Sequence, residues 1–304
     1  MNDNTVHLWR PFEGFQETLD TKFALVILNQ PIPESLDNIL VKLWENSAVR
    51  LCADGGFNQL AIWEHKMQKH AKEKIENISI LPDYVCGDLD SIDLTEVCHS
   101  MEKGTRFFQL NNQDMTDFHK TLRFAVNCVR NKEIDQEIIN HNKKTEFSFK
   151  SSDVAELVQT DFEQIYSICD IGGRTDHCIG NFNTLYRDTL VNFKIYLVSS
   201  ESMTFLLKKG INIIYIDDEL HCGQYCGFFP LGCPAIITTY GLKYNVYNKQ
   251  MKFGSFVSSS NEFNSNITTE EKLFIESRRI EVDLGRNHVI IETDNPLLWT
   301  MSIK

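Results

Sequence analysis

Short apolar runs alternate with segments of helical periodicity through the first two-thirds of the chain. Residues 23–28 (FALVIL) are continuously apolar, which is typical of a strand buried on both faces of a parallel sheet. Further strands are expected at 49–53, 84–87, 106–110, 164–169 and 193–198. Apolar positions three and four residues apart predict helices at 35–45, 58–70, 94–103, 115–129 and 179–186. This alternation predicts an α/β domain with a doubly wound, mostly parallel sheet.

After about residue 210 the pattern changes to short runs of alternating apolar and polar residues, separated by turn residues. Such runs predict strands at 211–216, 225–230, 235–240, 244–247, 254–257, 287–292 and 297–303. They indicate a smaller antiparallel β domain, either a sandwich or a barrel. We therefore expect an α/β domain over residues 1–205 and a β domain over 206–304. Polar insertions are expected at about 131–163 and, as a loop, at about 261–277.

The composition argues against certain classes of binding partner. The 304 residues carry a formal net charge of -12 without a long basic stripe, which argues against nucleic acid or an anionic membrane surface. The nine cysteines are scattered, several within apolar runs, as expected of reduced thiols. The start of the chain shows no apolar signal-peptide segment, and the apolar runs are too short to span a bilayer. These features predict a cytoplasmic protein with no membrane partner.

Acidic residues follow four of the expected parallel strands. They are Asp54, Asp88 with Asp90, Asp114 with Asp117, and Asp170 with Asp176. Ligands of open parallel sheets bind outside the carboxyl ends of the strands, where these residues would meet. Clustered carboxylates repel one another by about 1 kcal/mol per close pair even in water-like surroundings, so such a cluster needs cations. The arrangement predicts a metal-assisted phosphate site.

Asp88 and Asp90 are the clearest pair in this set. On an extended chain their side chains point to the same side, roughly 7 Å apart, which suits a hard divalent cation such as Mg²⁺. The alternative is a solvated turn, because Gly, Asp and Ser are ordinary loop residues. Nearby glycines allow a phosphate to approach the backbone, Arg174 offers bidentate contacts, and Lys120 adds a point charge. No Walker or protein-kinase motif is present.

Several short motifs occur in an order that is specific in combination. In the first half they are Ala53-Asp54-Gly55-Gly56, Gly87-Asp88-Leu89-Asp90-Ser91, Gln113-Asp114-Met115-Thr116-Asp117-Phe118-His119-Lys120 and Gly173-Arg174-Thr175-Asp176-His177. In the second half they are 238–245 (TTYGLKYN), 257–261 (VSSSN) and 292–301 (ETDNPLLWTM). With these motifs the chain resembles the thiamine pyrophosphokinases over most of its length.

The resemblance implies an ATP:thiamine diphosphotransferase, which transfers the β,γ-diphosphate of ATP to the thiamine hydroxyl and releases AMP. It implies a Rossmann-like N-terminal domain, a C-terminal β-sandwich that binds thiamine and forms the dimer, and a homodimer with active sites between subunits. Mg²⁺ would be held by Asp88, Asp90 and Asp117, and the catalytic set would include Arg174 and Asp176. Nucleotide and phosphate contacts would come from Asp54, Gly55, Gly56, Gln113, Thr116, Lys120 and Gly173, and thiamine contacts from Tyr244, Ser260 and Asn261.

Two departures from the family pattern concern the ligands. Animal members usually have tryptophan where Tyr244 stands, and Asp170 precedes a loop that is usually richer in glycine. Two other functions are compatible with parts of the sequence. Asp88-Leu89-Asp90 also fits the Asp-x-Asp motif of a nucleotide-sugar glycosyltransferase, commonly with Mn²⁺, and the departures also fit a non-catalytic module that binds thiamine or divalent ions. Metal-dependent release of AMP on addition of thiamine distinguishes the diphosphotransferase from both.

Overall fold

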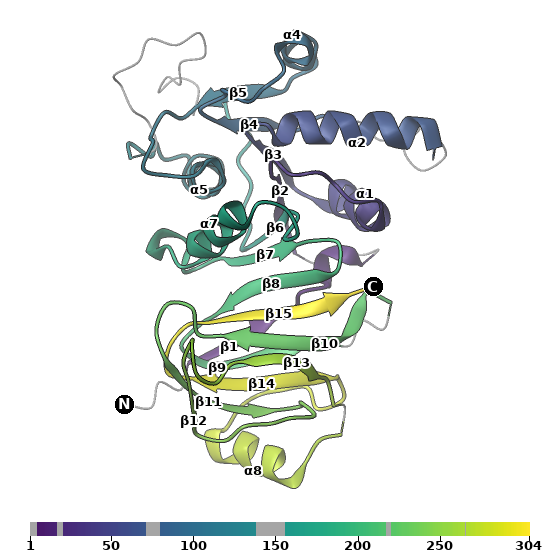
Figure 1. Ribbon diagram of the computed structural model, residues 1–304. Helices are drawn as coiled ribbons and strands as arrows, with labels where there is room; N and C mark the ends of the chain where they lie inside the picture. Colours follow the sequence, from purple (N-terminus) through teal and green to yellow (C-terminus); the bar gives the residue numbers. More distant parts are fainter. Residues whose placement is uncertain (1–4, 17–20, 71–79, 138–155, 217–219, 265) are drawn as a thin grey trace. The chain divides into compact units, whose positions relative to one another are not determined.

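The computed structural model describes residues 5–16, 21–70, 80–137, 156–216, 220–264 and 266–304. These residues form two compact units (Figure 1). One unit is Gly14–Ser200, and the other combines the residues before Gly14 with Glu201–Lys304. The sequence expectation instead kept the start of the chain in the first domain and placed the boundary after residue 205. Of the helices that the structure describes, none has the length and apolar character needed to cross a bilayer.

The unit Gly14–Ser200 contains a parallel sheet with the strand order β7-β6-β2-β3-β4-β5. The strands are β2 (Phe23–Ile27), β3 (Val49–Ala53), β4 (Tyr84–Gly87), β5 (Arg106–Gln109), β6 (Gln164–Ile168) and β7 (Lys194–Val198). Every residue of β2 and β6 is buried, as the uninterrupted apolar run of β2 predicts for a central strand. The doubly wound α/β architecture is confirmed.

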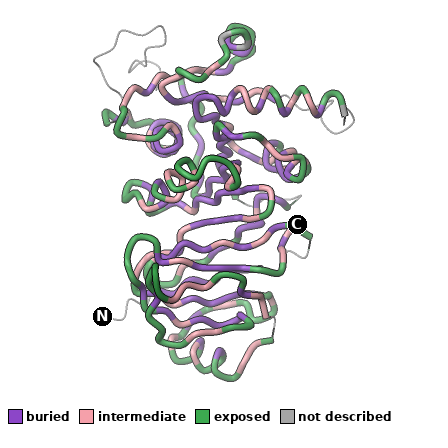
Figure 2. Tube along the Cα trace, viewed as in Figure 1, coloured by how far each residue is buried: buried purple, intermediate pink, exposed green. Residues whose placement is uncertain are grey.

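Helices cover both faces of this sheet. Figure 1 shows α1 (Asp37–Asn46) and α2 (Gly56–His70) on one side, and α5 (Asp117–Arg123) and α7 (Thr175–Leu185) on the other. Helix α1 alternates buried and more exposed positions, α5 is buried throughout after Asp117, and α7 is buried only at Thr184 and Leu185 (Figure 2). The remaining helical segments are α4 (Leu94–Glu102), the π-helix η3 (Phe124–Arg130) that continues α5, and the 3₁₀ turns η1 (Glu13–Phe15), η2 (Glu34–Leu36) and η4 (Asp188–Leu190).

The strand order reverses at β2. From β2 the chain adds β3, β4 and β5 in turn on one side, and it then returns to add β6 and β7 on the other side. The connections that leave β2 and β6 therefore diverge at their carboxyl ends and open a crevice there. This crevice is where a ligand is expected.

The second unit is a mostly antiparallel β-sandwich, as expected, in which β1 and β9 pair in parallel. One sheet has the order β1-β9-β14-β11-β12, and the other contains β8-β15-β10-β13. Trp9 of the first sheet stacks on Phe205 of the second with ring centroids 5.0 Å apart, so the sheets share one core. The strands are β1 (Val6–Trp9), β8 (Ser202–Leu207), β9 (Gly210–Tyr215), β10 (Cys222–Phe229), β11 (Ala235–Tyr240), β12 (Lys249–Met251), β13 (Ser258–Glu262), β14 (His288–Thr293) and β15 (Leu297–Ile303).

Two local expectations need correction, and a third is tested only in part. The segment 261–277, expected as a loop, contains the end of β13 and most of helix α8 (Thr269–Arg278). The strands expected at 244–247 and 254–257 are turns and loops, which adjoin β12 and β13. Of the insertion expected at about 131–163, residues 138–155 lie outside the described part, and the described flanks contain neither helix nor strand.

Candidate functional site

Three carboxylates meet at the carboxyl edge of the parallel sheet. Asp54 follows β3, Asp88 follows the neighbouring strand β4, and Asp117 opens α5, which packs on these strands. One oxygen from each lies within 4.8 Å of the other two. These three residues are neighbours, as the sequence predicts, because parallel strands bring their exit residues to one edge.

Unusual backbone angles make this close approach possible. Asp54 has a φ of 45°, and Gly87 has a φ of 153°, a region that favours glycine. A Cβ on Gly87 would lie 2.8 Å from Cβ of Asp54 and 3.1 Å from Oδ1 of Asp117. Gly87 thus leaves room for the carboxylates on either side of it.

A buried lysine stabilises part of the acidic cluster. Lys120 Nζ donates to Asp117 Oδ1 at 2.9 Å and lies 3.5 Å from Asp88 Oδ2, and its side chain is 2% exposed. Asp117 Oδ1 also accepts from the backbone N–H of Asp88 at 3.2 Å. Lys120, expected to contact phosphate, is therefore engaged with the carboxylates.

The charges of the cluster leave room for a divalent cation. Burial raises the pKa of Asp54; hydrogen bonds from Ser91 and the backbone of Gly55 oppose this shift, and the charges of Asp117 and Asp88 add to it. Asp88 Oδ1 is buried and has no hydrogen-bond partner among the described residues. Three carboxylates with one ammonium retain negative charge, and their oxygens are ligands that Mg²⁺ prefers. The residues fit such an ion.

Asp90 does not join this cluster. Leu89 has a φ of 62°, so the chain is not extended between Asp88 and Asp90 as the sequence argument assumed. Asp90 is exposed and accepts a hydrogen bond from Ser91 Oγ at 2.9 Å. Asp54 takes its place in the group of three.

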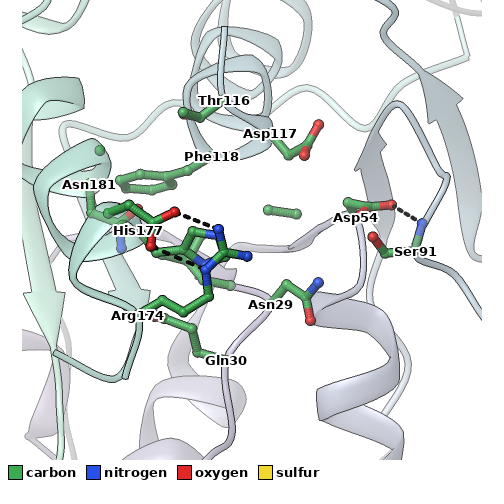
Figure 3. Close-up of a pocket in the computed structure, with 14 residues that line it drawn as sticks. Asn29, Gln30, Asp54, Ser91, Thr116, Asp117, Phe118, Arg174, His177 and Asn181 are labelled. Carbon is green, nitrogen blue, oxygen red and sulfur yellow. Dashed lines mark hydrogen bonds and ion pairs between the residues drawn. The ribbon is translucent and has the colours of Figure 1, made fainter. Parts of the chain in front are cut away.

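A cavity of about 490 Å³ lies beside the carboxylates, at the reversal of the strand order. Figure 3 shows Asp54 and Asp117 toward one end of it and Arg174 toward the other. Its lining comes from the exits of β2 and β3, from Ser91, from the start of α5 and from α7. The residues are Leu28, Asn29, Gln30, Ala53, Asp54, Ser91, Thr116, Asp117, Phe118, Arg174, Asp176, His177, Gly180 and Asn181.

Arg174 and Asp176 form an exposed ion pair in this cavity. Arg174 Nε donates to Asp176 Oδ1 at 3.1 Å and Nη2 to Oδ2 at 2.5 Å (Figure 3). This contact lowers the pKa of Asp176 and raises that of Arg174. The side chain of Arg174 is 69% exposed, so it is open to a phosphate group.

The other expected phosphate contacts lie at or near the same edge. Thr116 lines the cavity and caps α5 by accepting from the N–H of His119, and Gln113 Nε2 lies 3.4 Å from Asp88 Oδ2. Beside Gly173 there is open space. A Cβ on Gly56 would lie 2.3 Å from the carbonyl oxygen of Ile27, so glycine at this position allows α2 to start against β2.

Several residues that line the cavity were not predicted from the sequence. Asn29 and Gln30 directly follow the apolar run of β2, so the strand-edge rule could have found them without an acidic residue as the signal. Asn181 lies four residues after His177 on α7, a spacing that places both on one helix face.

The expected thiamine contacts lie in the second unit. Tyr244 is 59% exposed, and Lys243 Nζ lies 5.4 Å from its ring centroid. Ser260 is exposed with a φ of 61°, whereas Asn261 is 3% exposed. Asn261 is hydrogen bonded to the backbone of Tyr244.

Comparison with known proteins identifies both halves of the chain. Residues 40–197 match the family described as "Thiamin pyrophosphokinase, catalytic domain", and residues 211–274 match "Thiamin pyrophosphokinase, vitamin B1 binding domain". Thiamine pyrophosphokinase 2 of Arabidopsis thaliana is 32% identical over 95% of this chain and 89% of its own length. Thiamine pyrophosphokinase 1 of the same plant is 33% identical over 93% of this chain and 87% of its own length.

Solved structures show the same fold. Thiamin pyrophosphokinase from Candida albicans superposes with a TM-score of 0.71 at 24% identity, covering 100% of this chain and 95% of that one. Yeast thiamin pyrophosphokinase superposes with a TM-score of 0.69 at 24% identity. The match covers 98% of this chain and 91% of the yeast chain.

Proposed function

This chain belongs to the thiamine pyrophosphokinase family, and from that premise we propose which residues carry out its reaction. The reaction is the transfer of a diphosphate group from ATP to thiamine, which gives thiamine diphosphate and AMP. The observation that supports the assignment of residues is the group of three carboxylates beside a 490 Å³ cavity, inside the region that matches the catalytic domain.

We assign the metal site to Asp54, Asp88 and Asp117, with Mg²⁺ as the ion. The buried, unpartnered Oδ1 of Asp88 supports this assignment, because a buried carboxylate oxygen without a partner is costly. Asp90 stays a candidate ligand of the same ion. It lies outside the group of three and is exposed, but it follows Asp88 by two residues in the same loop. When bound, Mg²⁺ would neutralise charge on the phosphate oxygens of ATP.

Residues in the cavity and beside it would position the triphosphate. Arg174 would bind phosphate oxygens through its planar guanidinium, while Asp176 keeps that side chain at the cavity. Gln113 and Thr116 offer further hydrogen bonds, and the open space at Gly173 lets a phosphate approach the backbone. The thiamine hydroxyl would attack the β-phosphorus in line, so the protein mainly positions the reactants and stabilises charge.

Thiamine would bind in the second unit, with its ring against Tyr244 and with Ser260 nearby. An aromatic face attracts a cation such as the thiazolium, and Tyr244 is exposed enough to offer one. As the family resemblance implies, we propose a homodimer whose active sites lie between subunits. All nine cysteines are free thiols, which supports a reducing, cytoplasmic location.

The direct test is AMP formation from ATP with and without thiamine and Mg²⁺, with the product identified by mass. AMP and thiamine diphosphate in equal amounts, only when metal is present, are expected. ADP with thiamine monophosphate would overturn the assignment of the β-phosphorus. Binding of thiamine without turnover would indicate a non-catalytic module.

A further inference from the structure

We propose that Asn261 is a positioning residue for Tyr244 and that it does not itself contact thiamine. The inference rests on the proposed thiamine site, and it changes the role expected for Asn261 from the sequence. It follows from the hydrogen bonds, the burial and the backbone around the turn at 241–246, which carries Tyr244.

The side-chain amide of Asn261 is fully occupied within the protein. Its Oδ1 accepts from the backbone N–H groups of Tyr244 and Glu262 at 3.2 and 2.9 Å. Its Nδ2 donates to the carbonyl oxygen of Tyr244 at 3.0 Å and to Ser258 Oγ at 3.3 Å. An amide has two donors and two acceptor lone pairs, so these four bonds use its capacity. With 3% exposure, Asn261 has no polar group left for a ligand.

The same bonds hold the turn that carries Tyr244. Both backbone polar groups of Tyr244 bond to one side chain on β13, and the N–H of the preceding Lys243 donates to the carbonyl oxygen of Glu262 at 2.8 Å. On the inner side of the turn, Asn245 accepts from the N–H of Leu242 at 3.3 Å and donates to its carbonyl oxygen at 2.9 Å. The backbone is thus fixed on two sides while the ring of Tyr244 stays exposed.

A bulge in β13 lies next to Asn261. Cys226 of β10 pairs with Asn261, and Phe228 pairs with Ser258, so one residue of β10 lies opposite two of β13, Ser259 and Ser260. Ser260 has a φ of 61°, which lies in the left-handed region. Bulges of this kind redirect the following side chain, and strained backbone of this kind gathers at functional sites. The bulge is consistent with the role of Asn261, which follows it in β13 and is hydrogen bonded to the turn at 241–246.

A charged pair completes the surroundings of the ring. Lys243 Nζ lies 5.4 Å from the ring centroid of Tyr244 and 2.8 Å from Glu262 Oε1. Glu262 follows Asn261 directly, so β13 fixes the backbone of Tyr244 and holds a cation near its ring. If Asn261 moved, the aromatic surface offered to thiamine would lose its fixed orientation.

A double-mutant cycle tests this role, with Asn261→Ala, Tyr244→Ala and their combination. Asn261→Ala is expected to raise the KM for thiamine about tenfold, which corresponds to losing two neutral hydrogen bonds. The KM for ATP should stay within about twofold of wild type, because the side chain of Asn261 is hydrogen bonded to Tyr244, Ser258 and Glu262 and does not line the cavity beside the carboxylates. In the Tyr244→Ala background, loss of Asn261 should raise the thiamine KM by less than about twofold, because it acts through the missing ring.

Asn264→Ala is the matched control, since Asn264 follows the same strand and has no bond to Tyr244; its thiamine KM should match wild type. If Asn261→Ala does not fold, Asn261→Asp replaces it, because it keeps both acceptor bonds and loses both donor bonds. The positioning role would be overturned if the two substitutions raised the thiamine KM independently, so that their fold-changes multiplied in the double variant. It would also be overturned if Asn261→Ala left the thiamine KM unchanged. Neither result would overturn the proposed thiamine site. An unchanged KM in Tyr244→Ala would overturn the thiamine site and this inference with it.

Discussion

Asp117 illustrates how one side chain serves both the fold and the site. Its Oδ1 accepts from Lys120 and from the backbone of Asp88, whereas the bonds described leave Oδ2 for a cation. Asp117→Asn keeps an acceptor for both bonds and replaces the second oxygen with an amide nitrogen, which is a poor ligand for Mg²⁺. The variant should fold, with kcat lowered on the order of 10²–10³-fold, since several kcal/mol of charge stabilisation are lost.

The measurement combines steady-state kinetics with thermal unfolding at increasing Mg²⁺. Asp114→Asn is the control, because Asp114 is an exposed acid three residues away that lies outside the group of three. It should keep near-wild-type rates. A folded Asp117→Asn protein with full activity would contradict the metal assignment.

The sequence could predict most of this site because parallel strands bring their exits together. Asp54, Asp88 and Asp117 were among the seven acids that this rule placed at the edge, whereas the choice of Asp88, Asp90 and Asp117 as metal ligands came from the family resemblance. Asp90 did not meet them, because the left-handed backbone of Leu89 turns the chain, and no residue pattern marks a non-glycine residue at such an angle. The burial of Asn261 was also beyond prediction, since it depends on contacts with a turn 17 residues earlier.

At the scale of elements, the loop from β6 to α7 shows why a departure from the family can be tolerated. Asp170 Oδ1 accepts from the N–H of Gly172 at 2.8 Å, which closes a turn over the loop that leads to Arg174. The N–H of Asp170 donates to Oε1 of the buried Gln30 at 2.9 Å, so the loop is tied to the exit of β2. The acid is thus used as a turn residue.

This role predicts that Asp170→Asn keeps the wild-type KM for ATP, because asparagine forms the same turn without charge. Asp170→Ala should raise that KM by about three- to tenfold, since losing one hydrogen bond costs about 1 kcal/mol and loosens the loop. Steady-state kinetics at saturating thiamine would show the difference. A lower KM for ATP in Asp170→Asn would instead mean that the carboxylate repels the triphosphate.

Helix α8 shows what an apolar pattern misses. Its apolar residues Leu273, Phe274 and Ile275 are consecutive, so the 3.6-residue period is weak, and Leu273 is exposed. A local signal was nevertheless present. Thr268 caps the helix and Glu271 stands three residues later, the spacing of a capping box. The pairing of β1 with β9 had no such signal, because it joins segments 205 residues apart, as in Val6 and Ile211.

At the scale of the whole molecule, stability depends on charges buried inside each unit. In the second unit, His288 Nε2 lies 3.2 Å from Glu271 Oε1, and both side chains are almost inaccessible. Burial by itself lowers the pKa of His288. The ion-pair contact with Glu271, the hydrogen bond between Nδ1 and the carbonyl oxygen of Arg286, and the charge of Asp283 outweigh this effect, so the pKa is raised. The ring of Tyr215 packs against His288 as well.

The raised pKa predicts how the stability of the chain changes with pH. The stabilisation from protonated His288 is fully present below the unfolded pKa of about 6.5 and is lost as pH rises through the higher folded pKa. Glu271→Gln should therefore cost about 1.5–3 kcal/mol of unfolding free energy at pH 5.5, a magnitude typical of a polar contact with a charged group, and less at pH 9. Urea unfolding at both pH values measures this, with the exposed Glu270→Gln as control. An equal loss at both pH values would mean that His288 carries no charge in the pair.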